Sequence, residues 1–262
     1  MSLNKRLIRT NDTGGSGGEP QSFTYLDSAV ISAGNKPRYW NIAGNGLHAL
    51  WKNDNNQTTQ KATFSTAWDI TTAINSGTIS SGLYRRALGW NYDGSQQLGM
   101  VNVGAGIVGE NVSPNYAITN TGSVIANGIS QGYSYIFSPS ANGNYFYTGA
   151  LQQARQFITT TGKLTSSDSF SDTTYPVNGT PAVSADGKYL YIKELSPSGI
   201  VHIYSLSITY DLTSTKTFIK TLTLPSVSTT CDYFIVSSDG NYAYSYEFNQ
   251  TNGSVFRWQI NY

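Results

Sequence analysis

Residues 182–192 read AVSADGKYLYI, and this short stretch decides the fold. An apolar run leads into Asp186-Gly187, and a second run rich in aromatic residues comes directly after it. Asp-Gly and Asn-Gly pairs between two such runs are strong local signals for a β-hairpin, because the pair supplies the positive φ angles that a tight turn needs. The stretch therefore predicts a hairpin whose second strand is aromatic.

The same pattern occurs in four other places along the chain. The segments are YWNIAGNGLHALW (39–51), ALGWNYDGSQQLGMV (87–101), YIFSPSANGNYFYT (135–148) and FIVSSDGNYAYSY (234–246). The five turn glycines are Gly46, Gly94, Gly143, Gly187 and Gly240, separated by 48, 49, 44 and 53 residues. A supersecondary unit that recurs at this period is typical of a propeller.

The unit that contains Gly187 continues beyond its hairpin with further strands. We expect strands over 189–195, 201–209 and 216–224, and residues 201–208 alternate between apolar and polar with a period of two. Four strands within 40–50 residues match one propeller blade. Dividing residues 21–262 into five units gives 48.4 residues each, which agrees with the spacing of the glycines.

The last unit provides only three strands, over 233–237, 241–247 and 254–261. Residues 22–31 have the pattern of a strand that precedes the first unit and has no partner there. Pairing this strand with the last unit would cover an edge that is otherwise open. We therefore predict an all-β fold over residues 21–262, a five-bladed β-propeller of four-stranded antiparallel blades closed by an N-terminal strand.

Residues 1–20 have a different composition from the rest of the chain. The run from Gly14 to Gly18 has the composition of a flexible linker, and Pro20 marks the start of the folded part. We predict a flexible N-terminal arm that is disordered in isolation. Two interpretations stay open: an untidy terminus, or an arm that docks on a neighbouring subunit. The docking residues would be Leu3, Lys5, Arg6, Leu7, Ile8 and Arg9.

Composition excludes several classes of partner. Charged residues make up 12% of the chain and the net charge is +1, so there is no field that would steer it to nucleic acid or to an anionic membrane. No apolar run approaches the 18 or so residues of a membrane span, and the N-terminus lacks the apolar region of a signal peptide. Cys231 is the only cysteine, which excludes an intramolecular disulfide. We expect no nucleic acid, no membrane insertion, no cofactor and no metal.

Residues 65–73, STAWDITTA, resemble the LSTPWDISTA element of repeat proteins found among the structural proteins of bacteriophages and prophages. In those proteins it alternates with a strand pair similar to FSPDGTKMYV, which residues 136–139 and 183–192 resemble. Residues 4–11 resemble N-terminal peptides of phage tail and other virion proteins. The resemblance implies a propeller that is a component of a virion and is made in the host cytoplasm.

A degenerate copy of the first element occurs at residues 207–213, SITYDLT. Within the first copy, we expect Trp68 to fill space between blades. We expect Asp69 to cap the turn by accepting backbone N–H groups. Both residues are thus interpreted as structural.

Propellers of five blades include glycosidases, which place two or three acids around a central funnel. The predicted inner strands start near Arg38, Arg86, Tyr133, Thr180 and Asp232. Only Asp232 is an acid, and Asp93, Asp186 and Asp239 belong to the hairpin turns, where aspartate has a conformational role. The two histidines, His48 and His202, fall in strands of different units, which favours ordinary strand packing or surface placement over metal ligation. We predict that the protein is not an enzyme and has no catalytic residues.

A glycan-binding function stays open as an alternative. Aromatic rings beside amide and carboxylate groups suit sugars, which present an apolar face and polar edges. The candidates lie on two loops: Trp51, Asn53, Asp54 and Asn55 on one, Tyr246 and Asn249 on the other. The sequence therefore leaves three hypotheses. The first is a non-enzymatic bacteriophage structural protein, tethered through residues 1–20 to other proteins of the capsid, tail or fibre. The second is a module that attaches to a host surface glycan, and the third, least supported, is a glycoside hydrolase.

Overall fold

The computed structural model describes residues 18–33, 37–53, 58–80, 86–100, 107–118, 123–126, 138–150, 153–158, 163–165, 179–194, 199–226, 231–248 and 252–262. These residues form β-strands and turns, and one short 3-10 helix, η1 (Ile70–Thr72), interrupts them. The fold of this part of the chain is all-β, as predicted.

The strands make five four-stranded antiparallel sheets. Sheet 1 contains β2 (Pro37–Ile42), β3 (His48–Asn53), β4 (Thr58–Phe64) and β5 (Ala73–Ser80). Sheet 2 contains β6 (Arg86–Trp90), β7 (Gln96–Met100), β8 (Ile107–Asn111) and β9 (Ser123–Ala126). Sheet 3 contains β10 (Ser138–Pro139), β11 (Tyr145–Ala150), β12 (Gln153–Ile158) and β13 (Lys163–Thr165). Sheet 4 contains β14 (Gly179–Val183), β15 (Tyr189–Glu194), β16 (Ile200–Leu206) and β17 (Lys216–Thr223).

Sheet 5 combines the two ends of the described chain. Its order is β1 (Ser22–Ala33), β20 (Asn252–Asn261), β19 (Tyr242–Phe248) and β18 (Cys231–Val236). The β1–β20 ladder is antiparallel and runs from the pair Ser22 and Asn261 to the pair Ala33 and Asn252, with two irregularities in register. The first strand in sequence is therefore the outer strand of the last sheet.

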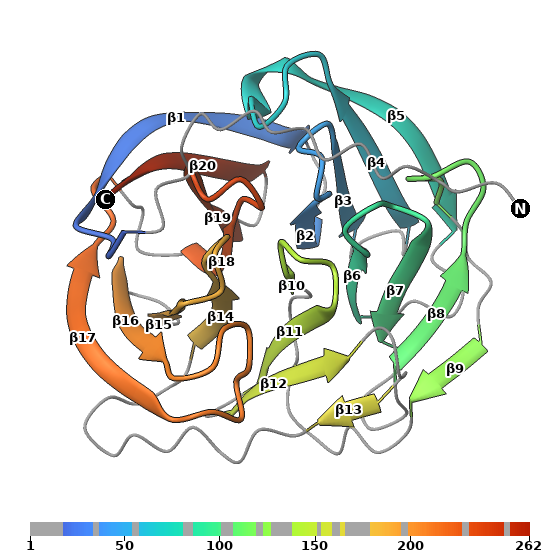
Figure 1. Cartoon of the computed structure of the whole chain (residues 1–262). Coiled ribbons are helices and arrows are strands. Elements are labelled where there is room, and N and C mark those ends of the chain that lie inside the picture. The colour runs from blue at the N-terminus through green and yellow to red at the C-terminus, as the bar shows by residue number, and fades with distance from the viewer. Residues whose placement is uncertain are drawn as a thin grey trace, which may run out of the picture.

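Figure 1 shows the sheets arranged around a common centre as in a β-propeller, with the first strand of each repeating unit innermost. Clusters of buried apolar side chains lie between neighbouring sheets. One cluster joins Trp40 of sheet 1 to Tyr244 of sheet 5, and a second joins Leu50 of sheet 1 to Trp90 of sheet 2. Another joins Tyr147 of sheet 3 to residues of sheet 4. The hydrophobic core of the described residues is thus distributed over the contacts between sheets.

The hairpin turns differ in one detail from the prediction. All five turn glycines have positive φ, between 69° and 77°, but the Asn or Asp before each of them does not. In the first turn the Gly46 amide donates to the Ala43 carbonyl at 2.9 Å, and Asn45 Oδ1 accepts the Leu47 amide at 2.9 Å. The glycine alone thus provides the left-handed residue, while the Asn or Asp side chain accepts a backbone N–H two residues on.

Candidate functional site

Trp68 packs against the turn glycine of its own sheet. A Cβ atom placed on Gly46 would lie 2.4 Å from Trp68 Cδ2, so the ring occupies the space that any larger residue would need. Trp68 itself has a φ of 65°, and its amide donates to the Gly46 carbonyl at 2.8 Å. A left-handed conformation costs a tryptophan about 1–2 kcal/mol, which this contact must offset.

Two other sheets repeat this arrangement with tyrosine. Tyr116 and Tyr210 have φ angles of 62° and 65°, and their amides donate to the carbonyls of Gly94 and Gly187 at 2.7 and 2.8 Å. A Cβ on Gly94 would lie 2.2 Å from the Tyr116 ring. Burial raises the pKa of Tyr116 to about 12, so its hydroxyl stays protonated. The repeated aromatic residue is therefore a lid over the turn, a role that the sequence did not reveal at Tyr116.

After two of the three lid residues an aspartate caps the next turn, as predicted for Asp69. Asp69 Oδ1 accepts the Thr71 amide at 3.1 Å and the Thr71 hydroxyl at 2.7 Å. Asp211 accepts the amide and the hydroxyl of Thr213, each at 2.7 Å. The hydroxyl bond from Thr71, aided by its amide and by the charge of Arg257, lowers the pKa of Asp69 although burial opposes the shift.

Side chains of sheet 5 converge on the main chain of Trp68. The Tyr244 hydroxyl donates to the Trp68 carbonyl at 2.8 Å, and Arg257 Nη1 donates to the same oxygen at 2.7 Å. Arg257 Nε also donates to Asp27 Oδ1 at 3.0 Å, and its Nη2 lies 3.4 Å from Asp69. Burial lowers the pKa of Arg257, but the hydrogen bond and charge of Asp27 outweigh it and raise the pKa above its ordinary value. We call Asp27, Asp69, Tyr244 and Arg257, together with the Trp68 carbonyl, the closure cluster; it joins β1, β19 and β20 to sheet 1. The prediction that Trp68 fills space between sheets is confirmed.

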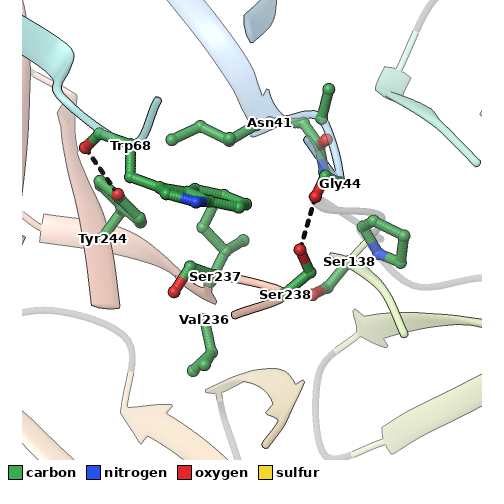
Figure 2. Close-up of a pocket in the computed structure, with 12 residues that line it drawn as sticks. Asn41, Gly44, Trp68, Ser138, Val236, Ser237, Ser238 and Tyr244 are labelled. Atoms are coloured by element: carbon green, nitrogen blue, oxygen red, sulfur yellow. Dashed lines mark hydrogen bonds between the residues drawn. The ribbon is translucent and has the colours of Figure 1, made fainter. Parts of the chain in front are cut away.

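A small cavity lies beside the closure cluster, where turns of sheets 1, 3 and 5 meet (Figure 2). Its walls include Trp68 and Tyr244, and Ser238 Oγ donates across it to the Gly44 carbonyl at 2.6 Å. There is room for about one water molecule and not for a metabolite. The cavity is therefore a packing gap near the centre of the ring.

The acids of the hairpin turns are used within those turns. Asp93 accepts the amide and hydroxyl of Ser95, at 3.0 and 2.6 Å. Asp186 and Asp239 each accept a serine hydroxyl and the backbone amide two residues on. Asp232 lies in β18, and its side chain is outside the described residues. These contacts confirm the conformational role predicted for the turn aspartates.

The two histidines occupy different environments. His48 lies against the Tyr116 ring, with the ring centroids 4.7 Å apart, in the contact between sheets 1 and 2. Burial, aided by the positive charge of Lys61, lowers the pKa of His48 to about 4. The ring is therefore neutral at physiological pH, and of the two structural roles expected for His48, strand packing is the one observed.

His202 forms a ladder across three strands of sheet 4. Its Nε2 lies 2.8 Å from Glu194 Oε1 and its Nδ1 lies 3.0 Å from Thr221 Oγ1. A hydroxyl, an imidazole and a carboxylate in this order also occur in nucleophilic catalysis. Here Thr221 is an exposed residue of the outer strand β17, and none of the three residues lines the cavity of Figure 2. The ladder is accounted for by cross-strand pairing, since His202 and Thr221 are direct neighbours in register.

The two aromatic residues proposed for glycan binding are not accessible to a ligand. Trp51 and Tyr246 are 1% and 0% exposed, because both are packed in the cluster between sheets 1 and 5. Neither ring can stack on a sugar, so the expectation is wrong for these two residues. Asn53 ends β3, and its side chain, like Asp54, Asn55 and Asn249, lies outside the described residues.

The predicted docking residues Leu3, Lys5, Arg6, Leu7, Ile8 and Arg9 also lie outside the described residues. In the part of the chain that is described, no group of three or more His, Cys, Asp or Glu side chains is placed to hold a metal ion. The described residues likewise contain no helix that is both long and apolar enough to cross a bilayer.

No protein-family model matches the chain, and no curated protein matches its sequence. Among solved structures, it is similar to a protein of Bacteroides uniformis provisionally named a 6-phosphogluconolactonase, with 16% identity, a TM-score of 0.49, and coverage of 80% of this chain and 66% of the other. A functionally unknown protein from Desulfotomaculum acetoxidans gives 13% identity, a TM-score of 0.47, and coverage of 84% and 68%. The chain thus spans about two thirds of the length of each. Likenesses of this strength assign no activity.

Proposed function

We propose that this protein is a non-enzymatic structural component of a bacteriophage particle. In this proposal residues 21–262 form a rigid five-bladed propeller. Residues 1–20 tether it to the proteins of the capsid, tail or fibre. The protein would be made in the host cytoplasm and would act in the virion.

The sheet order supports the five-bladed, closed form of this proposal. Five sheets of four strands are present, and β1 supplies the outer strand next to β20. The closure cluster around Arg257 lies where the last sheet meets the first. We propose that β1 closes the ring, so that the outer strand of the last blade comes from the beginning of the chain.

One observation carries the structural role: the residues that recur from repeat to repeat are engaged in holding the turns and the sheet contacts together. Trp68 and Tyr210 cover turn glycines, and Asp69 and Asp211 cap the turns directly after them. The assignment to a phage particle is supported by the resemblance of these same elements to virion repeat proteins.

The proposal is tested by removing residues 1–17 and measuring incorporation into particles of the phage that encodes the chain. We expect the truncated protein to keep its melting temperature within a few degrees and to be lost from purified particles. In the full-length chain, replacing Leu3, Leu7 and Ile8 together by alanine should have the same effect.

The matched control replaces Asn4 and Asn11 by alanine, which shortens polar side chains in the same segment and should leave incorporation unchanged. If the truncated protein enters particles at the wild-type level, the tether does not exist and the proposed function is wrong.

A further inference from the structure

The segment that leads into β1 is held by two sheets. Lys220 of β17 forms an ion pair with Glu19, and its Nζ donates to Gln21 Oε1 at 2.9 Å. The Gln21 amide donates to the Asn261 carbonyl at 2.7 Å, and Pro20 between them is buried. Residues 19–21 therefore connect the outer strand of sheet 4 to the last strand of sheet 5, and we call them the tether root.

The tether root lies on the outer wall of the ring. Both β1 and β17 are outer strands of their sheets, and they lie one after the other around the periphery in Figure 1. The cavity of Figure 2 is lined instead mainly by residues of β2, β10 and β18 and of the turns after β2 and β18, and these strands are innermost in Figure 1. A chain that leaves at residue 19 thus departs from the wall and not from the centre of a flat face.

The reach of the tether limits how far this wall can be from whatever the arm binds. Nine residues lie between Arg9 and Glu19, so ten peptide units join the two Cα atoms. Even fully extended, they span at most about 35 Å, and a glycine-rich segment of that length averages roughly 18 Å end to end. Docking of residues 3–9 would therefore bring the wall near the root, and not the far side of the ring, to the surface that binds the arm.

The exposed side chains of this wall suit contact with an uncharged protein surface. On β1 the outward positions are Ser22, Thr24, Leu26, Ser28 and Val30, and on β17 they include Thr217, Phe218 and Thr221. Leu26, Val30 and Phe218 are 39%, 59% and 36% exposed. None of these exposed positions carries a charge, and depletion of charged residues is a feature of the buried centre of protein–protein interfaces.

We propose that Lys220 is a positioning residue for the tether: it fixes the root at residues 19–21, so that the wall formed by β1 and β17 faces the particle protein that binds the arm. The identity of that partner rests on the proposed function. That Lys220 fixes residues 19–21 does not depend on the proposed function. The position of the root and the orientation of the wall therefore have separate tests.

The root is tested by hydrogen exchange of the amides of residues 21–24 in the full-length protein. Lys220→Glu places like charges together, and we expect exchange there to become about two- to fivefold faster, because a partly exposed ion pair contributes little more than that. The double variant Glu19→Lys with Lys220→Glu restores opposite charges and should restore the wild-type rate. Lys216→Glu, on the same strand, removes a donor to the Ser214 carbonyl and should leave these amides unchanged. Equal exchange in wild type and Lys220→Glu, or an equal effect of Lys216→Glu, overturns the assignment to Lys220.

The orientation is tested by cross-linking in purified particles, with single cysteines in a Cys231→Ser background. The variants Thr217→Cys, Asn111→Cys and Lys188→Cys are made singly: position 217 lies on the wall, position 111 at the end of β8 in sheet 2, and position 188 in the turn between β14 and β15. With a cross-linker about 10 Å long, we expect a product with a particle protein from position 217 only. Products that are equal or stronger at 111 or 188, or no product at 217, overturn the orientation. Loss of the arm without loss of incorporation would overturn the proposed function and leave the exchange result standing on its own.

Discussion

The hydroxyl of Tyr244 donates to the main-chain carbonyl of Trp68, although the two residues are 176 positions apart in the sequence. Tyr147 makes the equivalent bond to the Tyr210 carbonyl at 3.0 Å, between sheets 3 and 4. In both places a tyrosine of a second strand holds the left-handed aromatic residue of a neighbouring sheet. Burial raises the pKa of Tyr244 well above its ordinary value, so the hydroxyl remains a donor at alkaline pH.

Removing either hydroxyl should have a small and additive effect. We expect Tyr244→Phe and Tyr147→Phe each to lower the free energy of unfolding by about 1 kcal/mol, because one buried hydrogen bond is lost and the ring is kept. The sites belong to different sheet contacts, so the double variant should lose about 2 kcal/mol. Urea denaturation at pH 7 measures all three. A double variant that is no less stable than either single variant would show that the two hydrogen bonds are not independent.

Gly46 should tolerate no side chain. We expect Gly46→Ala to lower the free energy of unfolding by about 2–4 kcal/mol, because alanine would be left-handed there and its methyl group would overlap the Trp68 ring. Gly77→Ala is the matched control: φ is not positive and the nearest atom, Ile118 Cδ1, would be 3.5 Å away. Its effect should stay below about 1 kcal/mol, the usual cost of a substitution that meets no steric barrier. Similar urea midpoints for Gly46→Ala and Gly77→Ala would contradict the close packing of the Trp68 ring on Gly46.

The ion pairs of Arg257 and Lys188 should differ in strength. The side chain of Arg257 is 12% exposed, whereas that of Lys188, which pairs with Asp186 at 3.2 Å, is 54% exposed. We expect Arg257→Met to cost about 2–3 kcal/mol, because Asp27 and the Trp68 carbonyl lose a charged donor. Lys188→Met should cost no more than about 1 kcal/mol. Denaturation of both variants in the same buffer decides this, and a costlier Lys188→Met would mean that the closure cluster is not important for stability.

His48 should make stability depend on pH in the mildly acidic range. The unfolded chain binds a proton at this residue near pH 6.5, and the folded chain only near pH 4, because burial disfavours the charged ring. The contribution of the neutral His48 ring to the free energy of unfolding is therefore complete above pH 6.5 and is lost as the pH falls from 6.5 toward 4. We expect the difference in unfolding free energy between about pH 7 and pH 5 to shrink in His48→Asn. If the variant loses as much stability as the wild type over this interval, another group is responsible.

Local chemistry could be predicted from the sequence, and contacts between sheets could not. The Asp-Gly and Asn-Gly pairs located all five left-handed glycines of the described residues, and predicted strands such as 189–195 and 216–224 agree with β15 and β17 to within one residue. The cap at Asp69 was also predicted, since it depends on residues two positions apart. These features are fixed by near neighbours in the chain.

Burial of the second strands was misjudged for a physical reason. Alternation with a period of two separates one buried face from one exposed face, but β3 has a sheet packed on each side. Trp51 and its neighbour Lys52 are consequently both buried, at 1% and 2% exposure. Tyr246 is buried in the same way. Because burial on both faces leaves no alternating pattern, Trp51 and Tyr246 were wrongly predicted to be available to a ligand. The closure cluster was missed because Asp27, Asp69 and Arg257 are brought together by sheet order, and no local pattern records that.

The hydrogen bond between the Gln21 amide and the Asn261 carbonyl places the two ends of the folded chain beside each other. A peptide or reporter appended after Tyr262 would therefore emerge beside residues 18–21, and under the proposed function it would point toward the particle surface to which the arm docks. Cargo meant for display would be better inserted at a hairpin on the distant side, and a short peptide bridging residues 19 and 262 would allow the termini to be moved there without interrupting any sheet.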